Sequence, residues 1–396
     1  MNDVRPIFRL LTIYLISSFG SFLSFYAALF LIAETFANGL RLVPMTLAMR
    51  TLFGVVTPLW GAREFQSRGV FKTSLGAAFL GISGSVLCWI GIIYQDIWVV
   101  FFSFFLTSYA CESLRMLLLF ATKLRAENDQ IYRKIRGLSF GLAGGLTALA
   151  SALGGYFSHG RFWWILFAFD ILTFLALTIY VLAEYGWLNA FSFDGGEAQK
   201  MGFVQVARNI SRYWRYLLAS FCVFGFVALL PIVATDPLTL TNLVSERWRF
   251  VFLTYDSLAI FIAGLLYTYA GNSILRFILG VSFFNVIGIA AIVLTSNQIL
   301  WIANILIWPI VIEMGFQFLR DKFIKVESAQ EHLRRVAFSA SLSQLIFFVS
   351  PFLVYLCLNY SHGKSLLLLV LPLQTLIFAI CEIPGNVEAR DGFDRH

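Results

Sequence analysis

The chain has 396 residues, of which 59% are hydrophobic and only 13% are charged. Soluble globular proteins carry about 25% charged residues, so this composition excludes a soluble surface and indicates a protein that lies in a bilayer. The five cysteines are scattered, and all but Cys381 lie inside apolar runs, which argues against a disulfide scaffold. The net charge of +7 is divided among short clusters between apolar runs, a pattern that argues against nucleic-acid binding.

The apolar residues gather into runs long enough to cross a membrane, for which a helix needs about 20 residues. The first run, Leu10 to Ala33, is too long for the apolar region of a signal peptide, which has about 7–15 residues. None of the runs shows the alternation that barrel strands need, so the sequence predicts an all-α polytopic membrane protein. We expect twelve transmembrane helices, at about 10–33, 42–61, 73–94, 97–120, 137–157, 162–183, 216–235, 250–270, 274–295, 299–319, 336–358 and 365–383.

The basic residues predict the orientation of these helices. If the N-terminus is cytoplasmic, 22 of the 29 Lys and Arg residues fall in inner segments and 5 in outer loops. Cytoplasmic loops carry such an excess, so we expect both termini to be cytoplasmic. Short loops and the lack of a large appended domain favour a bacterial inner membrane.

The chain divides into two halves of six predicted helices. We expect an N-terminal bundle over 1–183, a cytoplasmic inter-domain loop over 184–215 and a C-terminal bundle with a short cytoplasmic tail over 216–396. The halves resemble one another at an offset of about 200 residues, because Glu112 and Glu313 are each followed by a basic loop and then by small residues. Two halves in the same orientation are a known plan of transporters.

One loop motif carries a resemblance to a known family. Residues Pro58 to Gly61 and then Gly69 resemble the motif that follows the second helix in the major facilitator superfamily, although the second glycine comes one residue late. Glu64 is the only acid near the position of the family's Asp, and the counterpart Gly264 to Gly271 carries no charge. The resemblance covers nearly the whole chain and implies alternating access between two six-helix bundles.

Glycines recur along the predicted fifth helix. Gly137, Gly141 and Gly145 are four residues apart and share one helix face, which lets another backbone approach closely. Gly154 and Gly155 resemble the end of a motif found in exporters of the superfamily. With Gly61 and Gly69, these residues are candidates for gating or packing between domains, and ordinary close packing is the alternative.

Ionisable side chains at membrane depth are costly and are therefore candidate sites. Arg50 lies mid-span, where a structural ion pair with a neighbouring acid is the alternative to a substrate role. Glu112 and Arg115 are three residues apart on one face, and Arg115 could instead extend to the headgroups.

Three acids complete the candidate set. Glu313 has no basic residue within a helical turn, so its charge has the least local compensation and we choose it as the proton-coupling group. The family resemblance implies that it faces the central cavity, as does Glu112. Asp256 lies nearer the outer face, where it could pair with Arg249 or gate the outer mouth. For Asp170 we favour a structural hydrogen bond to a neighbouring helix.

These residues predict a secondary transporter and no enzyme, with no catalytic residues, cofactor or metal site. All four histidines lie in loops or in the tail, and no ATP-binding domain is present. The interpretation we favour is proton-coupled export of a small amphipathic, cationic or zwitterionic solute by a monomer. Its partners would be the solute, protons or another coupling ion, and the bilayer. The alternatives are an importer or uniporter of a nutrient or metal chelate, a lipid-modifying enzyme, or a non-transporting membrane partner.

Overall fold

The computed structural model describes residues 5–37, 39–125, 129–158, 160, 162–190, 246–269, 329–358 and, between 310 and 324, residues 310, 313–315, 317–318, 320–321 and 323–324. Every regular element in these ranges is helical, which confirms the all-α class. The predicted seventh, ninth and twelfth helices, most of the tenth and the loop over 191–215 lie outside the described residues. The helices are α1 (Arg5–Thr35), α2 (Gly39–Arg68), α3 (Val70–Ile93), α4 (Ile97–Arg125), α5 (Asp129–Ser158), α6 (Trp164–Ala183), α7 (Tyr185–Asn189), α12 (Glu246–Tyr269) and α15 (Ala329–Leu358).

Five of the described helices contain stretches that are long and apolar enough to cross a membrane. They coincide with the predicted first, third, fourth, fifth and sixth spans, at Pro6–Thr35, Val70–Ile93, Ile97–Lys123, Lys134–Ser158 and Trp164–Ala183. Helix α2, which has 30 residues, is less apolar because it carries Arg41 near its start, Arg50 near its middle and three more charged residues near its end. Hydrophobic length therefore predicts most of the N-terminal half directly.

The connection after the second predicted span differs from the expected loop at 62–72. Helix α2 continues to Arg68, and the chain reverses at Gly69 alone before α3 begins at Val70. Gly69 has a φ of 80°, a conformation that costs glycine little because it has no Cβ. The polar residues before Gly69 prolong the helix beyond the apolar run, since a helix satisfies its own backbone in water as well as in lipid.

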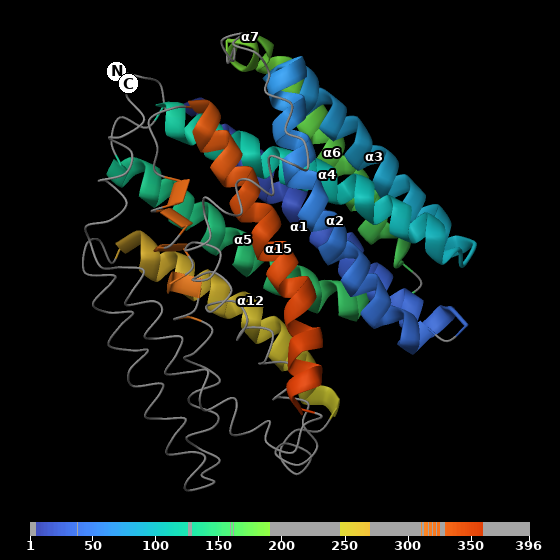
Figure 1. Cartoon of the computed structure of the whole chain (residues 1–396). Helices are drawn as coiled ribbons and strands as arrows, with labels where there is room; N and C mark the ends of the chain where they lie inside the picture. The colour runs from blue at the N-terminus through green and yellow to red at the C-terminus, as the bar shows by residue number, and fades with distance from the viewer. Residues whose placement is uncertain are drawn as a thin grey trace, which may run out of the picture.

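Helices α1 to α6 pack into one bundle. Helix α1 contacts α2, α4, α5 and α6, and α3 lies against α4 and α6. Two helices of the second half close on this bundle: α12 lies along α5, and α15 lies against α2 (Figure 1). The described contacts between the halves are therefore made mainly by two helix pairs.

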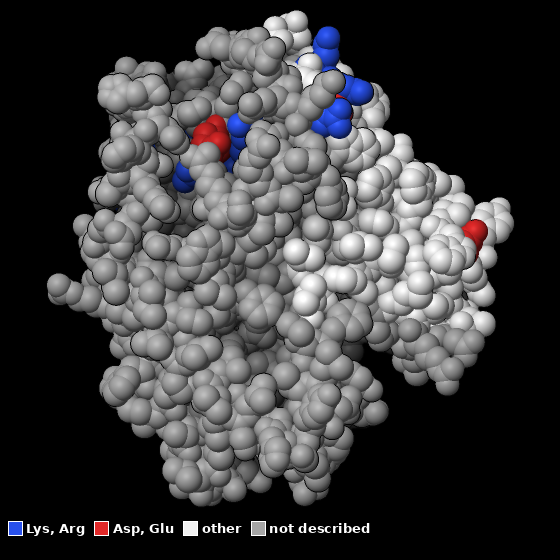
Figure 2. All heavy atoms as spheres, in the orientation of Figure 1, with Lys and Arg blue, Asp and Glu red and all other residues white. Residues whose placement is uncertain are grey.

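Charged side chains gather at one end of the bundle. On the face that Figure 2 shows, most of the visible Lys and Arg side chains lie towards the end where α7 is seen in Figure 1. Arg9 at the start of α1 pairs there with Glu184, 3.0 Å away, at the junction of α6 and α7. The same end holds the contacts between Arg136 and the second half described below.

Candidate functional site

Arg50 lies against aromatic rings of α1. Its guanidinium carbon is 3.6 Å from the ring centroid of Phe25 and 4.9 Å from that of Phe22. Among the described residues no acid pairs with it, so the structural ion pair weighed from the sequence is not found there. Cation–π contacts stabilise a guanidinium while leaving its N–H donors available. Arg50 is thus a positive group on an aromatic surface inside the first half.

Glu112 and Arg115 form an ion pair on α4. A nitrogen of Arg115 is 2.6 Å from a carboxylate oxygen of Glu112, and the two side chains are 15% and 24% exposed for Glu112 and Arg115 respectively. Arg115 therefore turns back along its own helix to Glu112. The pair is neutral as a unit, which leaves Arg50 as the net charge of the three first-half candidates.

Of the two second-half candidates, the structure describes the side chain of Glu313 but not that of Asp256. Asp256 lies on α12, but its side chain is outside the described part. Glu313 is buried and has a polar or electrostatic partner, and its role as the proton-coupling group stays a prediction. It lies one helical turn before Gln317, on the segment that meets the first half.

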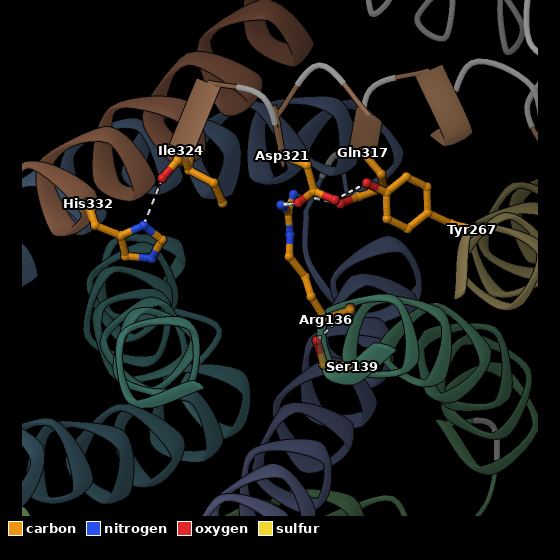
Figure 3. Close-up of polar contacts among 7 residues, drawn as sticks. All are labelled: Arg136, Ser139, Tyr267, Gln317, Asp321, Ile324 and His332. Carbon is orange, nitrogen blue, oxygen red and sulfur yellow. Dashed lines mark hydrogen bonds and ion pairs between the residues drawn. The ribbon is translucent and has the colours of Figure 1, made fainter. Parts of the chain in front are cut away.

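A cluster of polar side chains joins the two halves at the end where α5 begins (Figure 3). Arg136 of α5 forms an ion pair with Asp321 and donates a hydrogen bond of 2.9 Å to the side-chain oxygen of Gln317. Asp321 also accepts a hydrogen bond from the hydroxyl of Tyr267, near the end of α12. Arg136 and Gln317 are both almost fully buried. We call these four residues the cross-half cluster; they tie α5, α12 and the segment around 317–321 together.

The segment of the cross-half cluster is itself held by α15. Arg335 donates a hydrogen bond of 2.9 Å to the carbonyl of Phe323 and pairs with Glu331 at 3.0 Å. The Nδ1–H of His332 donates to the carbonyl of Ile324 at 2.9 Å. His332 precedes the predicted span 336–358; burial, with smaller effects of the Lys123 and Arg136 cations, lowers its pKa to about 4. Its ring is therefore neutral at physiological pH.

The glycines of α5 lie against α12. A Cβ on Gly264 would collide with the backbone of Gly141, and one on Gly141 would lie 3.1 Å from the carbonyl oxygen of Phe261. A Cβ on Gly137 would meet Thr268, and one on Gly145 would meet the ring of Phe261 at 3.1 Å. The two helix backbones therefore touch directly, as small residues allow.

Gly61 and Gly154 lie at other helix contacts, whereas a Cβ on Gly69 would meet nothing within 4 Å. A Cβ on Gly61 would be 2.5 Å from the end of Met116, so this residue packs α2 against α4 inside the first half. A Cβ on Gly154 would be 2.9 Å from Tyr26, which places Gly154 against α1. Gly155 is buried beside it. Glu64, next to the family's Asp position, pairs with Arg68 at 2.7 Å within α2.

Asp170 is completely buried between α1, α3 and α6. Its carboxylate accepts hydrogen bonds from Ser21 and Ser24 of α1 and from Ser85 of α3, which confirms the predicted hydrogen bond to a neighbouring helix. In the part of the chain that the structure describes, no group of three His, Cys, Asp or Glu side chains could hold a metal ion.

Sequence reasoning did not single out Arg136, Gln317, Asp321 and Tyr267. The basic loop ending at Arg136 was interpreted only as an orientation signal. The acid that pairs with it is 185 positions away, and no local pattern predicts such a contact. The only sequence signal near both Arg136 and Asp321 was the repeat of a basic loop in each half.

No protein-family model matches the sequence, and no curated protein matches it. Solved structures do match its fold. A bacterial homologue of the iron transporter ferroportin, in an outward-facing state, is 11% identical with a TM-score of 0.71, over 95% of this chain and 99% of that one. The human organic anion transporter MFSD10 is 12% identical with a TM-score of 0.69, over 95% and 100%. The fucose:proton symporter FucP of E. coli is 12% identical with a TM-score of 0.61, over 96% and 100%. The chain is an integral membrane protein with the fold of the major facilitator superfamily of transporters.

Proposed function

We propose that the protein is a proton-coupled secondary transporter for a small amphipathic solute that carries an anionic group, either an organic anion or a zwitterion. The observation that carries the proposal is the guanidinium of Arg50, which lies on the rings of Phe22 and Phe25 without an acidic partner among the described residues. A half-buried cation at membrane depth is costly unless a counter-charge or water reaches it. A carboxylate of the solute would supply that counter-charge, and the rings would contact its apolar part.

The charge balance favours this class over a simple cation. Glu112 is already neutralised by Arg115, so the first half offers one net positive group. The second half carries the acids Glu313 and Asp256, which we assign as counter-charges for the cationic group of a zwitterion. The printed names of two structures with this fold, an organic anion transporter and a proton symporter, agree with this class of solute and with proton coupling.

Alternating access requires contacts between the halves that form on one side and break in turn. The cross-half cluster suits that role, because its bonds are polar, buried and confined to one end of the bundle. We infer that this end is cytoplasmic, as the positive-inside pattern predicts, and that the structure has its cytoplasmic side closed. Gly141 and Gly264 would keep α5 and α12 in contact while the halves move.

The test is solute-driven proton flux in proteoliposomes that contain a pH-sensitive dye. A panel of amphipathic carboxylates, zwitterions and cations is compared for the wild type, Arg50→Gln and Arg63→Gln, the last being a matched control on the exposed surface of α2. We expect carboxylates or zwitterions to move protons with the wild type and with R63Q, and R50Q to lose that flux. Flux with cations alone, or full activity of R50Q, would refute the role given to Arg50. Solute movement without protons would make the protein a uniporter.

A further inference from the structure

A second buried charge in the first half has the features of a proton-binding site. Asp170 of α6 is completely buried, and its carboxylate has no ion-pair partner among the residues that the structure describes. An ionised carboxylate in such a place is expensive unless hydrogen bonds stabilise it or a proton neutralises it. Three hydroxyls from two other helices surround it.

The hydroxyls have alternative acceptors. Ser24 lies 2.8 Å from Oδ2 of Asp170 and 3.2 Å from the carbonyl of Ser21. Ser85 lies 2.7 Å from the same Oδ2 and 2.9 Å from the carbonyl of Gly81. A hydroxyl rotates freely and can donate to either oxygen. Both serines can therefore donate to an ionised carboxylate, or turn to the backbone carbonyls when Oδ2 carries a proton and becomes a donor itself.

The same hydroxyls contact the carboxylate directly. The oxygens of Ser21, Ser24 and Ser85 are in direct hydrogen-bond contact with the carboxylate, at 3.1, 2.8 and 2.7 Å. Gly20 lets the carboxylate lie against α1, because a Cβ there would be 3.0 Å from Oδ1 of Asp170. The carboxylate is therefore enclosed by three hydroxyls and by the backbone of α1.

We propose that Asp170 binds and releases a proton during the transport cycle, with Ser24 and Ser85 stabilising both of its forms, and that Arg50 couples this proton to the solute. The proposal rests on the transport function proposed above and names its coupling group, in place of Glu313.

The coupling runs through α1. Arg50 lies on the rings of Phe22 and Phe25, which directly follow Ser21 and Ser24, two residues whose hydroxyls contact Asp170. Opposite charges attract, so the guanidinium attracts the Asp170 carboxylate across α1. Among the described residues, the other titratable groups near Asp170 are the thiols of Cys88 on α3 and Cys111 on α4. A solute carboxylate bound to Arg50 cancels the attraction, so a proton joins Asp170 as the anion binds. Anion and proton then bind together, which is the thermodynamic requirement for symport.

Infrared difference spectroscopy on the full-length protein in lipid tests the site without any solute. Spectra are recorded from acidic to alkaline pH for the wild type, Asp170→Asn, Ser85→Ala, Arg50→Gln and the control Arg63→Gln. We expect a carboxylic-acid C=O band that titrates in the wild type and in R63Q and is absent in D170N. In R50Q the band should titrate over a different pH range than in the wild type, because the charge that attracts the carboxylate is gone. In S85A its frequency should change, because one hydrogen-bond partner of Oδ2 is lost.

Two results would overturn the proposal. If no band that depends on Asp170 changes with pH, the carboxyl keeps one protonation state and is only structural. If the band titrates identically in R50Q and the wild type, Arg50 does not couple to it. Proteoliposome flux separates this failure from that of the proposed function: solute-driven proton flux that survives D170N keeps the transporter and rejects Asp170 as its coupling group.

Discussion

The guanidinium of Arg136 on α5 forms a buried ion pair with the carboxylate of Asp321, on the other half of the molecule. Arg136 also donates a hydrogen bond to Gln317, and Asp321 accepts one from Tyr267, so four side chains from three segments meet at one point. Removing one member of a buried charge pair costs about 3–5 kcal/mol, because the other charge stays behind. The closed arrangement of the two halves should therefore depend on this contact.

We predict that Asp321→Asn loosens that end of the molecule. The expected result is faster amide hydrogen exchange at the start of α5 and at the end of α12, measured by mass spectrometry. Glu331→Gln is the control, because it removes an ion pair with Arg335 that lies within the second half. The double exchange Arg136→Asp with Asp321→Arg should restore slow exchange. Equal exchange in D321N and the wild type would show that the cross-half cluster does not hold the halves together.

The contact between α5 and α12 gives a prediction about packing. In Gly264→Ala the new methyl group would collide with the backbone of Gly141, and overpacking of this kind costs about 1–3 kcal/mol. We expect a lower midpoint of thermal unfolding in detergent. Gly76→Ala is the matched control, since a Cβ there meets nothing within 4 Å and glycine inside a helix is itself unfavourable by about 0.5–1 kcal/mol. A G264A protein as stable as G76A would contradict the close approach.

The pair on α4 predicts non-additive effects. Glu112→Gln and Arg115→Gln each leave one partly buried charge unpaired, whereas the double variant leaves none. We expect the double variant to unfold at a higher temperature than either single variant in a double-mutant cycle. The coupling should be modest, because solvent reaches Arg115. Additive losses would show that the two side chains are stabilised independently of each other.

His332 predicts a pH dependence of stability. Burial lowers its pKa from 6.5 to about 4 in the folded protein, so the unfolded chain binds the proton more readily. Folding stability should be complete above about pH 6.5 and fall as the pH drops towards 4, by up to about 3 kcal/mol. Thermal unfolding across this range measures the slope. His332→Asn has no proton to bind and can keep a donor near the Nδ1 position, so it should show a flatter profile; an unchanged slope would assign the effect to other groups.

The sequence was sufficient to predict most of the described helices but not the contacts between them. Five apolar runs of the N-terminal half became membrane-length helices, because hydrophobic length is a local property. The predicted loop after residue 61 was wrong, since the charged residues up to Arg68 remain helical. The ion pair that was one of two interpretations of Arg50 is not found among the described residues, where its guanidinium lies on two rings. The spacing of Glu112 and Arg115 did predict a shared face, because both residues belong to one helix.

The glycine contact between α5 and α12 differs in kind from the polar cluster beside it. Gly141 and Gly264 present smooth backbone to one another, without side chains that interlock or bonds that have a direction. Arg136 is only five positions from Gly141, about 7.5 Å along the helix axis. A backbone contact that permits rotation and a polar contact that can break therefore lie within two turns of the same helix. A small tilt of α12 on α5 would therefore change the distance between Arg136 and Asp321 without much sliding of the two helices along each other.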